Sequence, residues 1–199
     1  MTNAATDPRS HYAAAARWVH ALLGHVTADQ LDRPTPCGDL DVGTLARHLV
    51  ALGLQSVALA EAATAEGQPV QADEGTAEAF AAAHERAVAA WAAASLDREV
   101  IAPWGPATGA VALGMYANEL LVHGWDLAVA TGQPAEVPDG AVAAATETVA
   151  RVALPAELRA IPGFPFGPVV EPRDGAGPTE RLANWNGRDA AAWVRTANR

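Results

Sequence analysis

Apolar residues recur every three or four positions over several long stretches of the chain, which predicts amphipathic helices. The spacing predicts helices over 8–24, 42–66, 76–95 and 115–132, and a fifth from about 139 to 152. Asp7 followed by Pro8 is typical of a helix start. Asp39 or Asp41 is suited to cap the second helix, and Gly132 to end the fourth.

The segments between these helices are short or rich in Pro and Gly. The sequence predicts a linker over 67–75, a short extended segment at 99–101 with a loop at 103–109, and a Pro- and Gly-rich stretch over 155–178. Residues 164–170 could form one short strand, and a last helix is expected over 182–196 with an interruption at Asn186-Gly187.

Long helices joined in this way predict an all-α fold, an up-down four-helix bundle. We expect one domain over residues 1–199, with the bundle at about 1–153. Residues 154–199 would wrap the bundle as a C-terminal extension of short helices and at most a short strand.

Composition and charge limit the range of possible functions. Half of the 199 residues are apolar, which is enough for a core, and the net charge of -10 argues against nucleic acid and anionic membrane surfaces as partners. No apolar run is expected to span a bilayer. One cysteine excludes an internal disulfide, and with no signal-peptide pattern at the N-terminus it predicts a cytoplasmic protein. Alanine-rich faces are compatible with a monomer or a homodimer.

Three polar residues interrupt the apolar faces of two helices. Glu119 and His123 are four residues apart, so they share one side of the helix over 115–132. His48 lies three residues after Leu45 and four before Leu52, which turns it inward. Two imidazoles and a carboxylate suit Zn²⁺ or another divalent ion such as Ni²⁺, with one coordination position left open. The alternative is that the three side chains only hydrogen-bond one another.

Longer motifs surround these residues. They are Thr-Pro-Cys at 35–37, Leu-Ala-Arg-His-Leu at 45–49, Glu-Leu-Leu-Val-His-Gly-Trp-Asp-Leu-Ala at 119–128 with Ala-Thr-Gly at 130–132, and the tail motifs at 166–170, 181–182 and 187–189. On these motifs the chain resembles the actinobacterial metal-binding proteins related to mycothiol-dependent maleylpyruvate isomerase, within the DinB-like superfamily. The resemblance implies that His48, Glu119 and His123 bind the metal.

The resemblance has one limit. The isomerase carries a larger C-terminal domain that helps to form its active site, and 199 residues leave no room for it. Isomerisation of maleylpyruvate is therefore not implied. What the resemblance implies is the metal-binding bundle and the use of a low-molecular-weight thiol, mycothiol first.

Asp126, Cys37 and Arg188 are weaker candidates for the site. Asp126 lies three residues after His123 and could accept its second ring N–H, or pair with an arginine near a helix end. Cys37 precedes a helix start, where a thiolate can be stabilised, although a small buried residue is the commoner role. Arg188 could reach an acidic substrate, but pairing with a carboxylate is favoured.

Aromatic residues and one further histidine complete the candidates. Trp104 and Trp125 could wall a pocket or belong to the core. His84 lies on the same face as Phe80 and Trp91, where it could be a fourth ligand or, preferably, a core histidine with hydrogen-bond partners.

Two functions follow from a metal site, and a third from its absence. The first is an enzyme in which the metal activates a thiol or water toward a small electrophile, by thiol transfer, thiol-dependent isomerisation or hydrolysis. The second is a protein that binds metal or a small ligand without turnover, and the third is a purely structural bundle. The expected partners of the enzyme are a small-molecule thiol and an electrophilic substrate.

Overall fold

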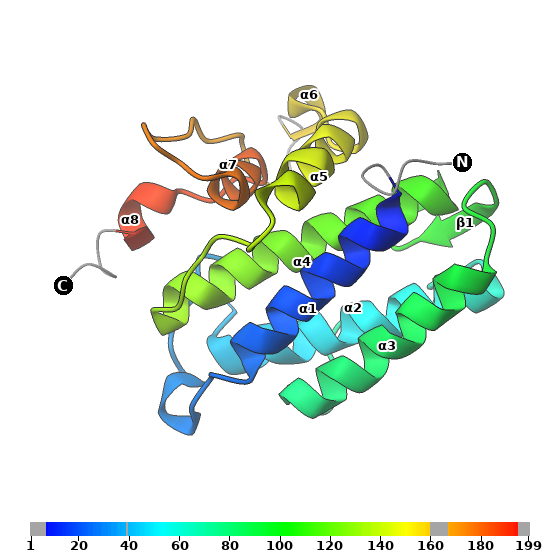
Figure 1. Cartoon of the computed structure of the whole chain (residues 1–199), viewed down its shortest axis with the longest axis horizontal. Helices are drawn as coiled ribbons and strands as arrows, with labels where there is room; N and C mark the ends of the chain where they lie inside the picture. Colours follow the sequence, from blue (N-terminus) through cyan, green and yellow to red (C-terminus); the bar gives the residue numbers. More distant parts are fainter. Residues whose placement is uncertain (1–6, 39, 160–166, 195–199) are drawn as a thin grey trace.

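Four long helices form a bundle in the computed structural model, which describes residues 7–38, 40–159 and 167–194. They are α1 (Pro8–Leu23), α2 (Val42–Ala62), α3 (Ala77–Ala93) and α4 (Gly109–Thr131). α1 and α2 each pack against both α3 and α4 (Figure 1). The prediction of an all-α bundle is confirmed.

The helix ends follow the expected chemistry with two corrections. Asp41 caps α2, where its Oδ1 accepts a hydrogen bond from the N–H of Thr44 at 2.7 Å, and Gly132 ends α4 in the left-handed conformation with φ 76°. However, α2 ends at Ala62, before the predicted residue 66, because Ala63 turns to φ 63°. α4 begins at Gly109 rather than 115, since the hydroxyl of Thr108 caps it.

The connection between α2 and α3 sets the direction of the bundle helices. Gly75, just before α3, lies against the first turns of α2. Near the other end, Nε1 of Trp91 on α3 donates to Oγ of Ser56 on α2 at 3.0 Å. α2 and α3 therefore run parallel, because residues 63–76 return along the bundle before α3 begins (Figure 1). The order of directions is up-down-down-up, which corrects the alternating up-down order predicted from the sequence.

A β-hairpin stands where the sequence predicted an extended segment and a loop. β1 (Glu99–Ala102) pairs antiparallel with β2 (Gly105–Thr108). The extended segment is confirmed, but the loop expected over 103–109 is largely the second strand. Pro106 in β2 hid it, because proline is disfavoured inside a sheet and tolerated at an edge. The hairpin is tied to the linker after α2, since the N–H of Ala65 donates to the carbonyl of Ile101 at 3.0 Å.

Small residues let the bundle helices approach closely. A Cβ built on Gly124 of α4 would lie 2.5 Å from the ring of Trp18 on α1, and one on Gly53 of α2 would lie 2.8 Å from Ala83 on α3. Glycine at both positions therefore allows the backbone of one helix to lie directly against a side chain of its neighbour. The same close contacts hold α2 and α4 in the fixed positions on which the site depends.

The C-terminal segment packs on the outside of the bundle. α5 (Gly140–Ala153) lies on α4, α6 (Ala156–Arg159) follows it, and α7 (Pro178–Trp185) packs on both α4 and α5 (Figure 1). The side-chain amides of Asn118 on α4 and Asn186 after α7 form a reciprocal buried pair at 3.1 and 2.9 Å.

The tail departs from the prediction in detail. The last helix begins at Pro178 rather than 182, and the expected interruption at 186–187 divides it into α7 and α8 (Ala190–Val194). Residues 167–170 are not in a strand, and the remainder of the segment at 164–170 lies outside the described residues, as does residue 196.

One helix in the described part of the chain, α2, is long and apolar enough to cross a membrane by length and composition alone, whereas the sequence predicted no such helix. Most of that apolar stretch is buried between α3 and α4. Its composition is therefore that of a central bundle helix.

Candidate metal centre

Three of the predicted site residues meet where α2 contacts α4. His48 on α2 and Glu119 and His123 on α4 each offer a ligand atom, and these atoms all lie within 4.8 Å of one another. Nε2 of His123 is 3.2 Å from Oε2 of Glu119, and the rings of His48 and His123 meet edge-on with centroids 5.0 Å apart. We call these three residues the triad.

A hydrogen bond fixes one ring nitrogen of each triad histidine. Nδ1 of His48 lies 2.8 Å from the carbonyl oxygen of Val70. Because a carbonyl only accepts, this Nδ1 carries hydrogen and Nε2 keeps its lone pair. Nδ1 of His123 is likewise 3.0 Å from Oδ2 of Asp126, and its Nε2 faces Glu119. Bonds of this kind select the tautomer and ring orientation of metal-binding histidines.

Opposing charges dominate the centre in its metal-free form. Burial lowers the pKa of His123, but hydrogen bonds with Asp126, Cys37 and Glu119 raise it well above its usual value. Burial raises the pKa of Glu119, but the hydrogen bond and charge of His123 bring it below the usual range. Burial and the nearby charge of His123 lower the pKa of His48. These shifts favour an imidazolium at His123, between two carboxylates, and a neutral ring at His48.

Asp126 is fully buried, and Arg188 stabilises its charge. Nη2 of Arg188 donates to Oδ2 of Asp126 at 3.0 Å, and Nε lies 3.3 Å from both carboxylate oxygens. Burial raises the pKa of Asp126, but the charge of Arg188 and the bond from His123 lower it overall. Asp126 thus has both of the roles considered for it. Arg188 follows α7, so the C-terminal segment reaches the centre through this ion pair.

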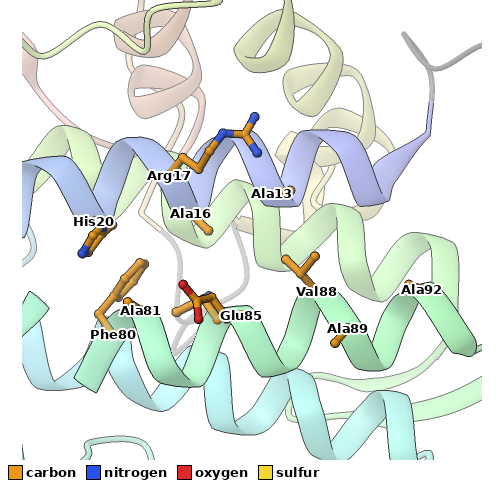
Figure 2. A pocket seen from close by; sticks show the side chains of 11 residues that line it. Ala13, Ala16, Arg17, His20, Phe80, Ala81, Glu85, Val88, Ala89 and Ala92 are labelled. Carbon is orange, nitrogen blue, oxygen red and sulfur yellow. The ribbon is translucent and has the colours of Figure 1, made fainter. Parts of the chain in front are cut away.

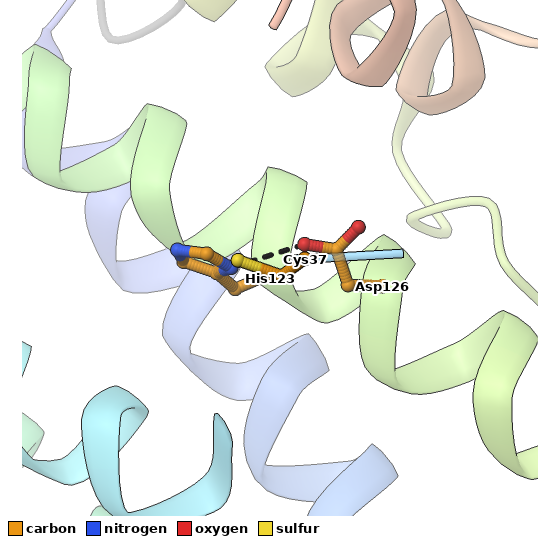
Figure 3. A group of neighbouring side chains, drawn as sticks. All are labelled: Cys37, His123 and Asp126. Atoms are coloured by element: carbon orange, nitrogen blue, oxygen red, sulfur yellow. Dashed lines mark hydrogen bonds and ion pairs between the residues drawn. The ribbon is translucent and has the colours of Figure 1, made fainter. Parts of the chain in front are cut away.

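Cys37 lies beside His123 and Asp126, in the loop before α2 (Figure 3). Its Sγ and the ligand atoms of those two residues lie within 4.8 Å of one another, and Cys37 is half-buried. The hydroxyl of Thr35 accepts a hydrogen bond from the N–H of Cys37 at 3.2 Å, which holds the loop. This second group suits a metal less well than the triad, because Asp126 is already engaged by Arg188 and by Nδ1 of His123.

His84 lies apart from the triad. Its Nε2 is 3.0 Å from the carbonyl oxygen of Leu49, and its Nδ1 is 2.7 Å from the hydroxyl of Tyr12. Nε2 therefore donates to the carbonyl and Nδ1 accepts from the hydroxyl, which leaves no lone pair for a metal. The ring also stacks on Phe80 with centroids 4.0 Å apart. His84 is a core histidine with both nitrogens satisfied.

The two candidate tryptophans occupy different environments. Trp125 is buried in the bundle core. Trp104, between β1 and β2, is 45% exposed, and its ring centroid is 5.4 Å from that of Tyr116. Tyr116 donates to Oε1 of Gln55 at 3.1 Å. The sequence prediction does not include Gln55 and places Tyr116 on an apolar face. Gln55 lies seven residues after His48, and Tyr116 lies seven residues before His123, on the same helix faces as these histidines.

A cavity of about 490 Å³ lies next to this polar pair. Gln55, the linker residues 65–68, Val70 and the hairpin residues 101–103 and 105 line it. Two hydrogen bonds place the cavity beside the triad, because the carbonyl of Val70 pairs with His48 and Gln55 pairs with Tyr116. Burial raises the pKa of Tyr116, and the nearby Glu119 adds to this shift. The cavity is therefore the pocket adjoining the centre.

A separate hollow of about 360 Å³ lies between α1 and α3 (Figure 2). Alanines, Phe80 and Val88 form most of its wall, and Arg17, His20 and Glu85 supply polar groups. The triad residues are not among those that line it. This hollow therefore lies outside the candidate centre.

The fold and the site together define a four-helix bundle with candidate metal ligands where α2 meets α4, which is consistent with the DinB-like superfamily. The chain belongs to the mycothiol maleylpyruvate isomerase N-terminal domain family, whose model matches residues 12–128. That range contains the whole triad and Asp126, whereas Arg188 lies beyond it.

Similar proteins extend this likeness over nearly the full chain. Two uncharacterized proteins of Mycobacterium tuberculosis, MT0763 of strain CDC 1551 / Oshkosh and Rv0738 of strain ATCC 25618 / H37Rv, are each 32% identical over 194 residues. The aligned region covers 92% of this chain and 98% of each relative. No solved structure matches the chain.

Proposed function

We propose that the triad binds one divalent metal ion, zinc first, and that the protein uses this centre to act on a small electrophile with a low-molecular-weight thiol. The observation that carries the proposal is the paired orientation of the histidines. Nδ1–H of each ring is held from outside, by Val70 or by Asp126, so both Nε2 atoms face the Glu119 side and can bind an ion that displaces the proton of His123. Hydrogen bonds among the triad alone would not need these outer partners.

The donor set fits a divalent ion of intermediate softness. Two imidazole nitrogens and one carboxylate oxygen are typical of zinc sites that keep an open position, with ligand distances of about 2.0–2.2 Å. Glu119 would supply the negative charge that offsets the ion. Nickel and other divalent ions suit the same ligands, so the physiological metal is decided by measurement rather than by donor type.

The thiol part of the proposal rests on the family and on the open position. The family takes its name from a mycothiol maleylpyruvate isomerase. Three protein ligands would leave one coordination position of the metal for an external ligand. A divalent ion bound there would stabilise a thiol sulfur as the thiolate. The pocket beside the triad then holds the electrophile, with Gln55 in its wall and Tyr116 hydrogen-bonded to Gln55.

Metal stoichiometry tests the first part. We expect about one zinc per wild-type chain, and near-complete loss in His48→Ala, in His123→Ala and in the double variant. His20→Ala is a matched control because His20 is an exposed histidine on α1, and it should bind zinc as wild type does. Equal zinc contents in the double variant and wild type would overturn the proposal.

Thiol consumption tests the second part. Zinc-loaded wild type should consume mycothiol with a panel of electrophiles faster than metal-free protein or His123→Ala. Glu119→Gln should weaken metal binding and slow turnover, since it removes the charge that balances the ion. If all samples match the uncatalysed rate and calorimetry shows no thiol binding to the loaded form, the protein is a metal-binding protein without this activity.

A further inference from the structure

The walls of the pocket beside the triad carry a distinct chemical pattern. Among the described residues that line it, none has a positively charged side chain, and the only ionisable one is Glu66. The chain contains no lysine, so arginine would have to provide any cation. Arg188, which comes near the centre, already pairs with the buried Asp126.

Apolar side chains gather at the mouth of the same pocket. Val70 is 70% exposed and Ile101 is 48% exposed, and both line the cavity. Trp104 lies between Pro103 and Gly105, two further lining residues, and is also half-exposed. A single exposed apolar residue needs no explanation. Three from the linker and the hairpin around one cavity form a surface suited to an apolar ligand.

Apart from Glu66, the polar side chains in the pocket wall are neutral, and the amide of Gln55 is already hydrogen-bonded. Gln55 donates through Nε2 to the carbonyl of Pro69 at 2.8 Å and accepts from Tyr116 at 3.1 Å. Gln68 is the other neutral polar side chain in the wall. A carboxylate entering the pocket would lose water without gaining a cationic side chain from the wall, which is costly, and would lie near Glu66.

We infer that this pocket binds an uncharged electrophile with an apolar body and excludes dicarboxylates. The inference rests on the proposed function, because the triad next to the pocket gives the bound molecule its role. It also separates this chain from the enzyme named in the family's description, whose substrate maleylpyruvate carries two carboxylates. Trp104 and Ile101 would contact the apolar body, and Gln68 can donate to one neutral oxygen.

A matched pair of unreactive probes tests the charge preference. Dimethyl phthalate is uncharged, and phthalate has the same ring with two carboxylates. Binding is followed by NMR through the indole N–H signal of Trp104, identified by its loss in Trp104→Phe. The diester should shift this signal with a dissociation constant at least about tenfold below that of phthalate. Equal or tighter binding of phthalate, or no shift with the diester, would overturn the inference.

Charge insertion gives the second arm of the test. Val70→Arg places a cation at the pocket mouth and should raise the affinity for phthalate by about tenfold or more relative to wild type. Val152→Arg is the control, because Val152 on α5 is 81% exposed and does not line the pocket. Ile101→Arg repeats the test if Val70→Arg does not fold, as judged by circular dichroism. Unchanged phthalate binding in a folded pocket variant would contradict the inference.

The outcome can be separated from that of the metal proposal. Probe binding is measured on metal-free and zinc-loaded protein, since the pocket walls do not include the triad. If zinc binds but the diester does not, the metal proposal stands and the substrate inference falls. If the diester binds and zinc does not, the pocket preference stands and the metal proposal falls.

Discussion

Nδ1 of His123 lies 3.0 Å from Oδ2 of Asp126, inside a bundle core that leaves Asp126 no exposed surface. A buried carboxylate is costly unless its charge is balanced. Here Arg188 from the C-terminal segment provides that balance. The segment that wraps the bundle therefore takes part in the centre, because it keeps Asp126 ionised and so keeps the His123 ring in place.

Removing the charge of Asp126 should weaken the centre. In Asp126→Asn the side chain keeps its shape, but it loses the charge that holds Nδ1–H of His123. We expect zinc affinity to fall by about 10- to 100-fold, measured by competition with a chromophoric chelator. Asp139→Asn is the matched control, since Asp139 is an exposed cap of α5 and asparagine caps as well. Equal zinc affinities for wild type and Asp126→Asn would rule out this role.

Zinc affinity should rise with pH. The ion must displace the proton of His123, whose pKa is well above its usual value because hydrogen bonds to two carboxylates and Cys37 outweigh burial. The pKa of His48 is lowered, so that ring is already neutral. From about pH 6.5 to the pKa of His123, log affinity should rise by about one per pH unit, with one proton released.

The pH dependence is measured by competition titration with a chelator of known pKa values, and the released proton by calorimetry in two buffers of different ionisation enthalpy. The residual binding of His48→Ala, measured at higher zinc concentration, should retain the same slope, because the displaced proton belongs to His123. An affinity that stays constant across this pH range would show that His123 holds no proton in the metal-free protein.

His84 should control stability in acid. Burial lowers its pKa from 6.5 to about 4, with the bond to Leu49 opposing. Between pH 6.5 and about pH 4 the unfolded chain binds a proton on His84 that the folded protein does not bind. The free energy of unfolding therefore decreases as pH falls. By linkage the loss is about 3 kcal/mol from pH 6.5 to about 4. His84→Gln, which does not titrate, should be less stable at pH 7 but should lose less stability on acidification.

Urea denaturation at several pH values checks this prediction. The quantity to compare is the difference in unfolding free energy between wild type and His84→Gln, because other groups titrate alike in both. His20→Gln serves as the control, because His20 is an exposed histidine on α1. A wild-type minus variant difference that is independent of pH would mean that His84 has the same pKa in the folded and unfolded protein.

The sequence was sufficient for the triad but not for its surroundings. Glu119 and His123 share a helix, so their spacing alone places them together, and His48 was found by its position in an apolar stripe. Asp126 hydrogen-bonds both His123 and Arg188, and Arg188 lies far from the other two in the chain. Spacing within one helix carries no information about which tail residue packs there, so pairing was favoured for Arg188 without naming the partner.

The apolar pattern of the sequence also could not predict the directions of the helices or the pairing of the two strands. Apolar periodicity located α1 to α4, but the course of residues 63–76, which makes α2 and α3 parallel, depends on tertiary contacts such as that of Gly75 with the start of α2. The sequence predicts a loop in place of the second hairpin strand, because Gly105 and Pro106 are turn-type residues. These two features position the linker and hairpin that wall the pocket.

Gly124 offers a test of the close contact between α1 and α4. Alanine normally stabilises a helix interior relative to glycine by roughly 1 kcal/mol. Here the added Cβ would lie 2.5 Å from the ring of Trp18 and 3.0 Å from Val19, so something must move. Overpacking of a filled core costs about 1–3 kcal/mol. We therefore expect Gly124→Ala to lower the free energy of unfolding, measured with chelator present so that bound metal does not mask the change.

A second glycine and a double variant complete the test. Gly24→Ala is the control, because Gly24 has φ -64° and the nearest atoms to its Cβ would be 3.6 Å away. It should be neutral or slightly stabilising, since alanine reduces the freedom of the unfolded chain. Trp18→Leu should relieve the contact, so the double variant with Gly124→Ala should lose less stability than the sum of the single variants. Additive losses, or a stabilised Gly124→Ala, would show that α1 can shift without cost.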